Sequence, residues 1–420
     1  MKKLIYFLLV LTSLDTFAQS RLLSLQFYSQ ALQANKNVNV YLPDGYNEND
    51  AVHYPVIYYL HGAGGNQNSD AFIKDTLDAM ISSGRIQPVI LVKPDGSTLR
   101  YLGSFYTNST LYGNFEDYIV NDLVSFIDSA FKTTSKRGII GHSMGAFGAA
   151  KLAFKHQNKF IVFAAHSGPL DFSKLVDLKD RIIYESGSIP YHYSPANGIF
   201  SLLGFTMAGA FSPNLQATPE PVDFLIDSMG IIIDSIFEKW NVHNPTRLAQ
   251  SYDKSLRMSI YFDCGTYDEL GMYSFNTAFR DSLVSLNIPH KFISFSGLHS
   301  QQLKTRIPVS LKFVDSVFNS TATYAKNDNA VLINKFTLEQ NYPNPFNGET
   351  IIRYNVPKKS TVKIKIFNVI GREVDTILEE EKEEGEYSVR YSAKSLSSGV
   401  YYYQVQEGDQ FNIKKMILLK

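Results

Sequence analysis

A single pentapeptide, Gly141–Gly145 (Gly-His-Ser-Met-Gly), constrains the fold of this chain more than any other stretch. It follows the short apolar segment Arg137–Ile140 and precedes a run of small residues, Ala146–Leu152. A strand, this Gly-x-Ser-x-Gly pattern and a helix together form a sharp turn that exposes the serine at the end of a sheet. The glycines leave room for a strained backbone beside closely packed neighbours. A flexible Gly/Ser loop is the alternative, and the flanking strand and helix argue against it.

Strands and helices are predicted to alternate on both sides of the pentapeptide. Continuous apolar runs are typical of strands that are buried on both faces, and amphipathic periodicity predicts helices at 69–83 and 116–131. Strands are predicted at 22–42 (an antiparallel pair), 55–60, 88–94, 137–140, 160–165, 258–262 and 291–295. This order predicts an α/β fold in which helices cover both faces of a mostly parallel sheet, giving three layers.

Residues 181–244 interrupt this alternation with Gly, Pro, Ser and aromatic residues. We expect an insertion there, over the end of the sheet that carries Ser143, because loops at that end commonly contact substrate. The alternative is a set of covering helices without a substrate role.

Length and charge narrow the class of protein. A chain of 420 residues is too long for one compact core and predicts two domains. Forty basic residues balance forty acidic ones, so the net charge gives no reason to expect a nucleic-acid or membrane-surface partner.

Residues 1–18 have the pattern of a secretory signal peptide. Lys2 and Lys3 precede the apolar stretch Leu4–Leu14, and Thr16–Ala18 resembles a cleavage site. The apolar stretch is shorter than the ~20 residues that span a bilayer, so we expect export without a membrane segment after signal removal. Cys264 is the only cysteine, which excludes an internal disulfide and cysteine-cluster metal sites.

The C-terminal part of the chain has a different pattern. Residues 320–329 are polar and aperiodic, which predicts a linker after a first domain at 19–319. Short alternating strands separated by turns then predict a β-sandwich at 330–420. Its strands are expected at 362–368, 369–371, 387–391, 400–405 and 413–419, and the acidic run 379–386 is expected to form a hairpin tip in solvent.

An exposed serine on such a turn needs a base and an acid that follow it in the order Ser, Asp or Glu, His. His290 and His299 lie late enough in the chain, and only His299 comes after the last strand, at the end where Ser143 is expected. Asp263 still belongs to the strand end, whereas Asp268 lies on a loop that can reach an imidazole. We therefore favour Asp268, and expect Asp263 to cap the loop through backbone amides.

Two backbone amides are expected to bind the negatively charged oxygen that forms when Ser143 attacks a carbonyl group. One is the amide of Met144, and the other is assigned to Ala63 in the Gly-rich loop His61–Asn66. That loop lacks the Gly-Lys-Ser/Thr ending of a phosphate-binding loop. His61, His142 and His166 are expected to be packing or supporting residues, and no metal or organic cofactor is implied.

Four segments together resemble the esterase D-like family of α/β-hydrolases, over about residues 22–317. They are Leu60–Asn66, Gly141–Gly145, Asp263–Asp268 and Gly297–Ser300. The family includes S-formylglutathione hydrolases, feruloyl and acetyl-xylan esterases and mycolyltransferases. The resemblance implies a triad of Ser143, Asp268 and His299, with Ala63 and Met144 as oxyanion donors. Leu298 departs from the family, in which many members have a second glycine before the histidine, and we expect it to alter loop packing only.

The tail resembles the C-terminal sorting domain of type IX secretion. The resemblance rests on Phe336–Asn347, Gly371–Glu373, Ser398–Tyr401 and the terminal segment Lys414–Lys420. It implies export by the type IX machinery and a secreted or surface-attached protein. A glycan-binding accessory sandwich is the alternative.

The sequence thus predicts a secreted serine esterase that forms an acyl-enzyme on Ser143. Export argues against a glutathione thioester as substrate, since that thiol belongs to the cytosol, and acyl or feruloyl esters on polysaccharide are expected instead. The alternatives are an acyltransferase that passes the acyl group to a sugar hydroxyl, and a non-catalytic surface binding protein.

Overall fold

The computed structural model describes residues 19–320 except 188, and residues 337–420 except 339, 342, 357, 384 and 409. The predicted signal peptide lies outside the described residues, as does the predicted linker apart from Ser320. The chain divides into two compact units, Met1–Thr321 and Ala322–Lys420, and each is described by itself. None of the described helices is long and apolar enough to cross a bilayer.

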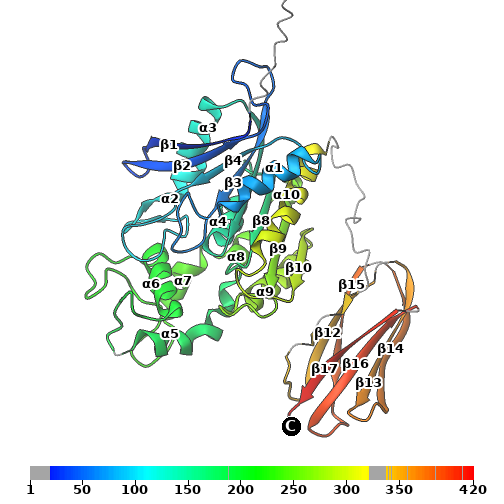
Figure 1. The fold of residues 1–420 in the computed structure, drawn as a ribbon. Helices are drawn as coiled ribbons and strands as arrows, with labels where there is room; N and C mark the ends of the chain where they lie inside the picture. Colours follow the sequence, from blue (N-terminus) through cyan, green and yellow to red (C-terminus); the bar gives the residue numbers. More distant parts are fainter. Residues whose placement is uncertain are drawn as a thin grey trace, which may run out of the picture. The chain divides into compact units, whose positions relative to one another are not determined.

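The first unit is built on an eight-stranded sheet with the order β1-β2-β4-β3-β7-β8-β9-β10 (Figure 1). β1 and β2 form an antiparallel pair, β2 is antiparallel to β4, and every other neighbouring pair is parallel. The strands are β1 (Arg21–Ser29), β2 (Ala34–Leu42), β3 (Tyr54–Leu60), β4 (Ile90–Pro94), β7 (Thr133–His142), β8 (Val162–His166), β9 (Ser259–Gly265) and β10 (Lys291–Phe295). The predicted α/β sheet is confirmed.

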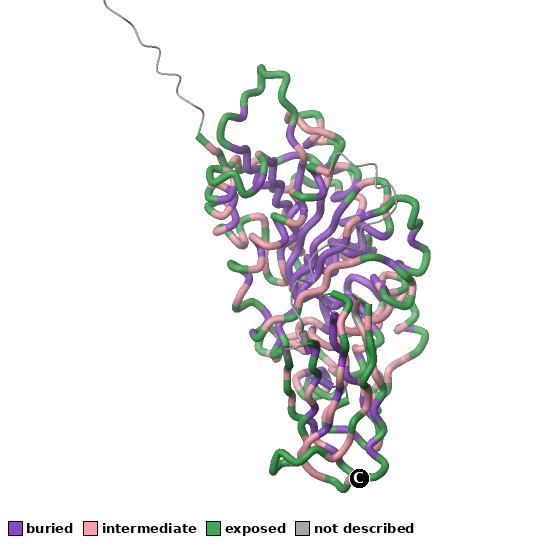
Figure 2. Tube along the Cα trace, turned by 90° about the vertical axis from the view of Figure 1, so that its right-hand side faces the viewer, coloured by how far each residue is buried: buried purple, intermediate pink, exposed green. Residues whose placement is uncertain are grey.

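Helices cover both faces of this sheet, which explains the continuous apolar runs of the strands. Ile57 and Tyr59 of β3 pack with residues of α1 (Phe72–Ser82) and α10 (Leu303–Asn319). The alternate residues of β3, including Tyr58 and Leu60, belong to the core formed with α3, α4 and α9. Figure 2 shows the buried residues concentrated along the strands. The helices of that second face are α3 (Val124–Ala130), α4 (Met144–Lys155) and α9 (Met272–Ser285).

The helix expected at 116–131 is one continuous helical stretch with a π-helical middle. It comprises α2 (Phe115–Asp117), η1 (Tyr118–Leu123) and α3. A short hairpin of β5 (Asn108–Ser109) and β6 (Gly113–Asn114) precedes it.

The segment between β8 and β9 contains the predicted insertion. α5, α6 and α7 gather at one end of this unit (Figure 1). The elements of this segment are η2 (Phe172–Leu178), α5 (Lys179–Ser186), α6 (Ile199–Phe211), α7 (Asp234–Asn241), α8 (Pro245–Ala249) and η3 (Lys254–Leu256).

The second unit consists of two antiparallel sheets with the orders β11-β12-β15 and β14-β13-β16-β17, around an apolar core that includes Ile352, Ile364 and Tyr403. The strand expected at 369–371 is wrong: these residues form the turn between β13 and β14, where Gly371 has a φ of 76° and Val369 and Ile370 are exposed. The hairpin tip expected at 379–386 is also wrong: this run holds the end of β14 and the start of β15, which belong to different sheets and do not pair with each other. The strands are β11 (Thr337–Leu338), β12 (Glu349–Val356), β13 (Ser360–Asn368), β14 (Glu373–Lys382), β15 (Gly385–Ser392), β16 (Gly399–Glu407) and β17 (Gln410–Leu418).

A substitution at Gly145 would test how tightly α4 packs against the sheet. A Cβ atom at Gly145 would lie 1.9 Å from the carbonyl oxygen of Leu60 at the end of β3. Because the oxygen that this Cβ would meet belongs to the backbone and cannot rotate away, we expect Gly145→Ala to lower the free energy of unfolding by about 3 kcal/mol. Urea titration followed by the fluorescence of Trp240 measures this. Gly204→Ala in α6 is the matched control, since its Cβ would meet only side chains, at 3.3 Å or more. Equal losses in the two variants would contradict this account.

Candidate active site

Ser143 lies on a strained turn between β7 and α4. Its backbone has φ 56° and ψ −118°, and its N–H donates to the carbonyl of His166 at 2.9 Å. A Cβ atom at Gly141 would lie 2.1 Å from the carbonyl oxygen of Gly145, so the turn requires glycine at both positions. A positive φ at a non-glycine residue costs free energy and commonly marks a functional position. The turn therefore has the geometry expected for a nucleophile.

The loop after β3 lies directly beside this turn. A Cβ atom at Gly62 would be 3.4 Å from Cβ of Ser143 and 3.5 Å from Nδ1 of His142. The amides of Gly64 and Gly65 donate to the carbonyls of Leu102 and Gly62, at 2.7 and 3.1 Å. Among the described residues no such bond is found for the amide of Ala63. Met144 is the first residue of α4, so its amide has no acceptor within the helix.

The side chain of His61 holds the loop after β3 in place through two hydrogen bonds. Its Nε2 accepts a hydrogen bond from the amide of Gly96 at 2.9 Å, so Nδ1 carries the proton and donates to the carbonyl of Gly62 at 2.8 Å. The hydroxyl of Tyr106 donates to the carbonyl of His61 at 3.0 Å. Burial lowers the pKa of His61, which keeps the ring neutral in this role.

Asp268 and His299 form a buried pair on two neighbouring loops. Nδ1 of His299 donates to Oδ2 of Asp268 at 2.8 Å. The other carboxylate oxygen, Oδ1, accepts the amide of Leu270 at 3.0 Å, which fixes the side chain. The two loops can approach each other because residue 265 is a glycine. A Cβ atom at Gly265 would lie 2.2 Å from the carbonyl oxygen of Gly297. The structure thus places the side chains of Asp268 and His299 in direct contact.

Nε2 of His299 is buried and has no hydrogen-bond partner among the described residues. Among the described residues, no hydrogen bond joins the hydroxyl of Ser143 to this nitrogen. Hydrogen bonds of this kind are often long or misaligned in an unliganded protein and shorten when substrate binds. A buried nitrogen without a partner is costly, which indicates a site that is kept ready for an incoming group.

Asp263 belongs to a different network, so the expectation that it caps its loop through backbone amides is wrong. Its carboxylate accepts from Nδ1 of His166 at 2.9 Å, from Nε of Arg306 at 3.0 Å and from the hydroxyl of Tyr261 at 2.7 Å. Burial alone would raise the pKa of Asp263, and His166 and Arg306 lower it instead. Asp263 lies on the same face of β9 as Tyr261, which packs against α10, and a buried carboxylate there needs a charged partner.

Glu269, whose carboxylate binds the backbone amide of His299, was not predicted from the sequence. Oε2 of Glu269 accepts the amide of His299 at 2.8 Å. Glu269 directly follows Asp268, and its adjacency to the acid was the only available signal. On the other side, Nε2 of His142 lies 3.3 Å from the carbonyl of His299.

His290 lies at the opposite end of β10, with Nδ1 2.9 Å from the carbonyl of Ile288, as the sequence predicts for a residue outside the site.

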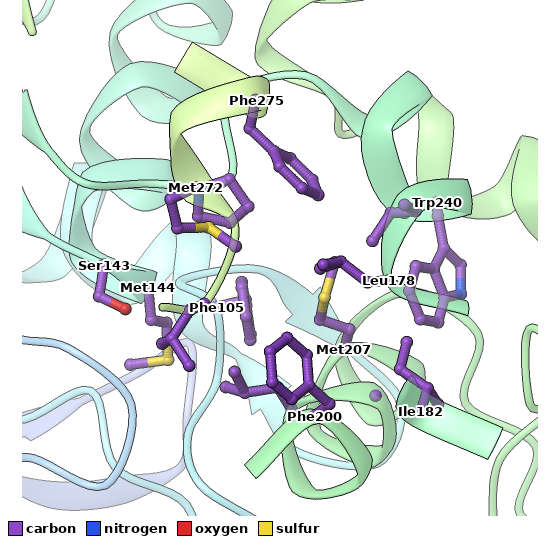
Figure 3. Close-up of a pocket in the computed structure, with 15 residues that line it drawn as sticks. Phe105, Ser143, Met144, Leu178, Ile182, Phe200, Met207, Trp240, Met272 and Phe275 are labelled. Atoms are coloured by element: carbon purple, nitrogen blue, oxygen red, sulfur yellow. The ribbon is translucent and has the colours of Figure 1, made fainter. Parts of the chain in front are cut away.

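A pocket opens beside Ser143 and Met144, which we call the apolar pocket (Figure 3). Its walls come mainly from the segment between β8 and β9, together with Phe105, Leu270 and the first turn of α9. Ser143 and Met144 lie at one side of it, with Ile182 and Trp240 at the opposite side (Figure 3). The other labelled lining residues are Phe105, Leu178, Phe200, Met207, Met272 and Phe275.

This sheet order, the strained serine turn and the Asp–His pair on the following loops define the α/β-hydrolase class. Residues 29–302 match the model of the esterase family, which is described as "Putative esterase". The chain belongs to this family. Residues 340–419 match the model of the secretion system C-terminal sorting domain, which is the mark of a secreted or surface-attached protein.

Two curated relatives and one solved structure are similar to this chain. Esterase Rv1288 of Mycobacterium tuberculosis is 27% identical over 286 residues, which cover 66% of this chain and 56% of that protein. Esterase MT1326, from another strain of the same organism, gives the same values. The chain thus spans about half the length of these relatives. A ferulic acid esterase structure covers 72% of this chain and 100% of its own, with a TM-score of 0.52 at 20% identity, which supports the fold alone.

Asp263 and Asp268 are expected to differ in their effect on stability. Asp263→Asn removes the negative charge from Arg306 and His166, and removal of one partner of a buried ion pair is costly. We expect a loss of about 3 kcal/mol in the free energy of unfolding. Asp268→Asn keeps an oxygen for the amide of Leu270, and we expect it to cost less than about 1.5 kcal/mol. Urea denaturation of both variants measures the difference, and a larger loss for Asp268→Asn would contradict this assignment.

His142 is expected to make stability depend on pH. Its burial, with His299 adding to the effect, lowers its pKa from 6.5 to about 3. Between these values the unfolded chain binds a proton that the folded chain does not, so the free energy of unfolding falls as the pH falls. The contribution of this group is up to ~1.36 kcal/mol per pH unit. Urea titrations at about pH 6 and about pH 4 should show a shallower dependence for His142→Gln than for the wild type. His53→Gln, which alters an exposed histidine, should leave the slope unchanged. Equal slopes in the wild type and His142→Gln would contradict the prediction.

Proposed function

We propose that the protein is an exported carboxylic ester hydrolase in which Ser143 forms an acyl-enzyme. The observation that carries this proposal is the strained Ser143 turn together with the buried Asp268–His299 pair, in which Nε2 of His299 has no hydrogen-bond partner among the residues that the structure describes. Membership of the esterase family supports the same reaction class.

In the proposed reaction, Nε2 of His299 takes the proton of Ser143 as its oxygen attacks the ester carbonyl. Asp268 holds the imidazole with Nδ1 protonated and stabilises the cation that forms. The amides of Met144 and Ala63 bind the oxygen on which negative charge develops. His299 then protonates the leaving alcohol, and water attacks the acyl-enzyme in a second step of the same kind.

Export through the type IX machinery is part of the proposal, because the tail matches a sorting domain. An ester linked to a polysaccharide is the expected substrate outside the cell. That expectation rests on export alone, since the similarity to a ferulic acid esterase structure supports the fold only. Transfer of the acyl group to a sugar hydroxyl is the runner-up, and product analysis with an added sugar acceptor distinguishes the two reactions.

The test uses the chain without residues 1–18. We expect hydrolysis of p-nitrophenyl butyrate, and we expect Ser143→Ala to lower kcat by about 10³-fold or more. Mass spectrometry of the wild type with a slow ester should find the acyl group on the peptide that contains Ser143. A wild-type protein as inert as Ser143→Ala would overturn the proposal in favour of a binding protein.

The acid assignment has its own test. Asp268→Asn should lower kcat by about 10²–10⁴-fold while the protein stays folded, because His299 then loses the partner that fixes its tautomer. Asp263→Asn, compared at a temperature at which it is folded, should keep most of its activity. The reverse order of these effects would overturn the assignment.

A further inference from the structure

The apolar pocket has a composition that restricts what can enter it. None of its lining side chains is charged. Apart from the hydroxyl of Ser143, the one nitrogen or oxygen atom on these side chains is the indole nitrogen of Trp240. That N–H already donates to the hydroxyl of Ser212 at 2.8 Å, in a buried pair. Beyond Ser143, the pocket side chains therefore offer no free hydrogen-bonding N–H or O–H group.

The position of the pocket indicates which half of an ester would fill it. Ser143 and Met144 line it, and these supply the proposed attacking oxygen and one oxyanion donor. His299, which must reach the leaving oxygen to protonate it, does not line the pocket. The group that extends from the carbonyl carbon into the pocket is therefore the acyl chain, and the alcohol leaves on the His299 side.

On this basis, and resting on the proposed function, we propose that the preferred acyl group is an aliphatic chain longer than butyryl. A feruloyl group would bury its phenolic hydroxyl among side chains that cannot bond to it, which is costly. An acetyl group, with one carbon beyond the carbonyl, would leave the side of the pocket lined by Ile182 and Trp240 unfilled (Figure 3). The side chains of Met144, Met207 and Met272 suit a flexible chain, because methionine adapts to irregular contacts.

The insertion supplies this selectivity. α6 contributes Phe200, Leu203 and Met207, and α7 contributes Trp240. The sequence left open whether the insertion contacts substrate or merely covers the sheet, and the pocket favours contact. This inference replaces the feruloyl group of the expected substrate with an aliphatic acyl group.

A chain-length series tests the inference. Each methylene group that enters an apolar site raises kcat/KM by up to about fourfold. We expect p-nitrophenyl octanoate to exceed p-nitrophenyl acetate by at least about 30-fold in kcat/KM, and methyl octanoate to exceed methyl ferulate. Octyl acetate, which carries the chain on the alcohol, should gain little over ethyl acetate. A flat series, a preference for ferulate, or an equal gain for octyl acetate would overturn the inference.

Two neighbouring leucines of α6 give a matched pair of variants. Leu203 lines the pocket, whereas Leu202 is equally half-buried and does not. Leu203→Trp should lower the octanoate-to-acetate ratio of kcat/KM by at least about tenfold, because the larger ring fills the space of the chain. Leu202→Trp should leave the ratio within about twofold. Equal ratios in the two variants would contradict the assignment.

Trp240 provides a readout that does not depend on catalysis. It is the only tryptophan of the chain and lines the pocket, so a bromine atom that enters the pocket should quench its fluorescence. Ser143→Ala titrated with methyl 8-bromooctanoate should lose more than half of its emission, whereas methyl octanoate and methyl 3-bromopropanoate should not quench it. Absence of quenching up to the solubility limit overturns the inference.

The failures of the two proposals are distinguishable. Ser143-dependent hydrolysis of acetate without a chain-length preference or quenching would leave the proposed function standing and remove this inference. Quenching without hydrolysis of any ester would remove the proposed function and leave an aliphatic binding site.

Discussion

The close approach of β3, β7 and the start of α4 is the constraint on which the rest of the site depends. With no Cβ atom at Gly145, the helix begins against the carbonyl of Leu60, and with none at Gly141 the turn can close on itself. This packing brings the loop after β3 next to Ser143, as the position of Gly62 shows. The absence of Cβ atoms at these glycines therefore determines both the strained backbone of Ser143 and the position of the amides that face it.

A second group of buried contacts holds α4 in this position. Lys151 of α4 is fully buried, and its ammonium group pairs with Glu116 at 2.8 Å and donates to the carbonyl of Tyr106 at 2.9 Å. Tyr106 in turn donates to the carbonyl of His61 at the base of the loop after β3. The helix that begins directly after Ser143 and the loop beside it are thus joined through one chain of hydrogen bonds, which favours a preorganised site.

Much of the fold could be predicted from the sequence because the relevant signals are local. Apolar runs marked the parallel strands, and the order of residues after Ser143 left only His299 at the correct end of the sheet. The role of Asp263 could not be read in this way, because its partners His166 and Arg306 lie about a hundred and forty residues apart and meet only in the folded chain. The turn at Val369–Gly371 was mistaken for a strand because two exposed apolar residues imitate a buried run. The walls of the apolar pocket come from several helices and loops that lie far apart in the chain, and no single stretch of sequence reveals such a surface.

The single cysteine has a consequence for a protein that acts outside the cell. Cys264 is buried, its Sγ lies 3.6 Å from the carboxylate of Asp268, and burial raises the pKa of its thiol. A thiol that stays protonated and shielded exchanges poorly with oxidants or with other thiols. The chain can therefore mature in an oxidising environment without any thiol chemistry, and a cysteine introduced on its surface would become its one readily modified position.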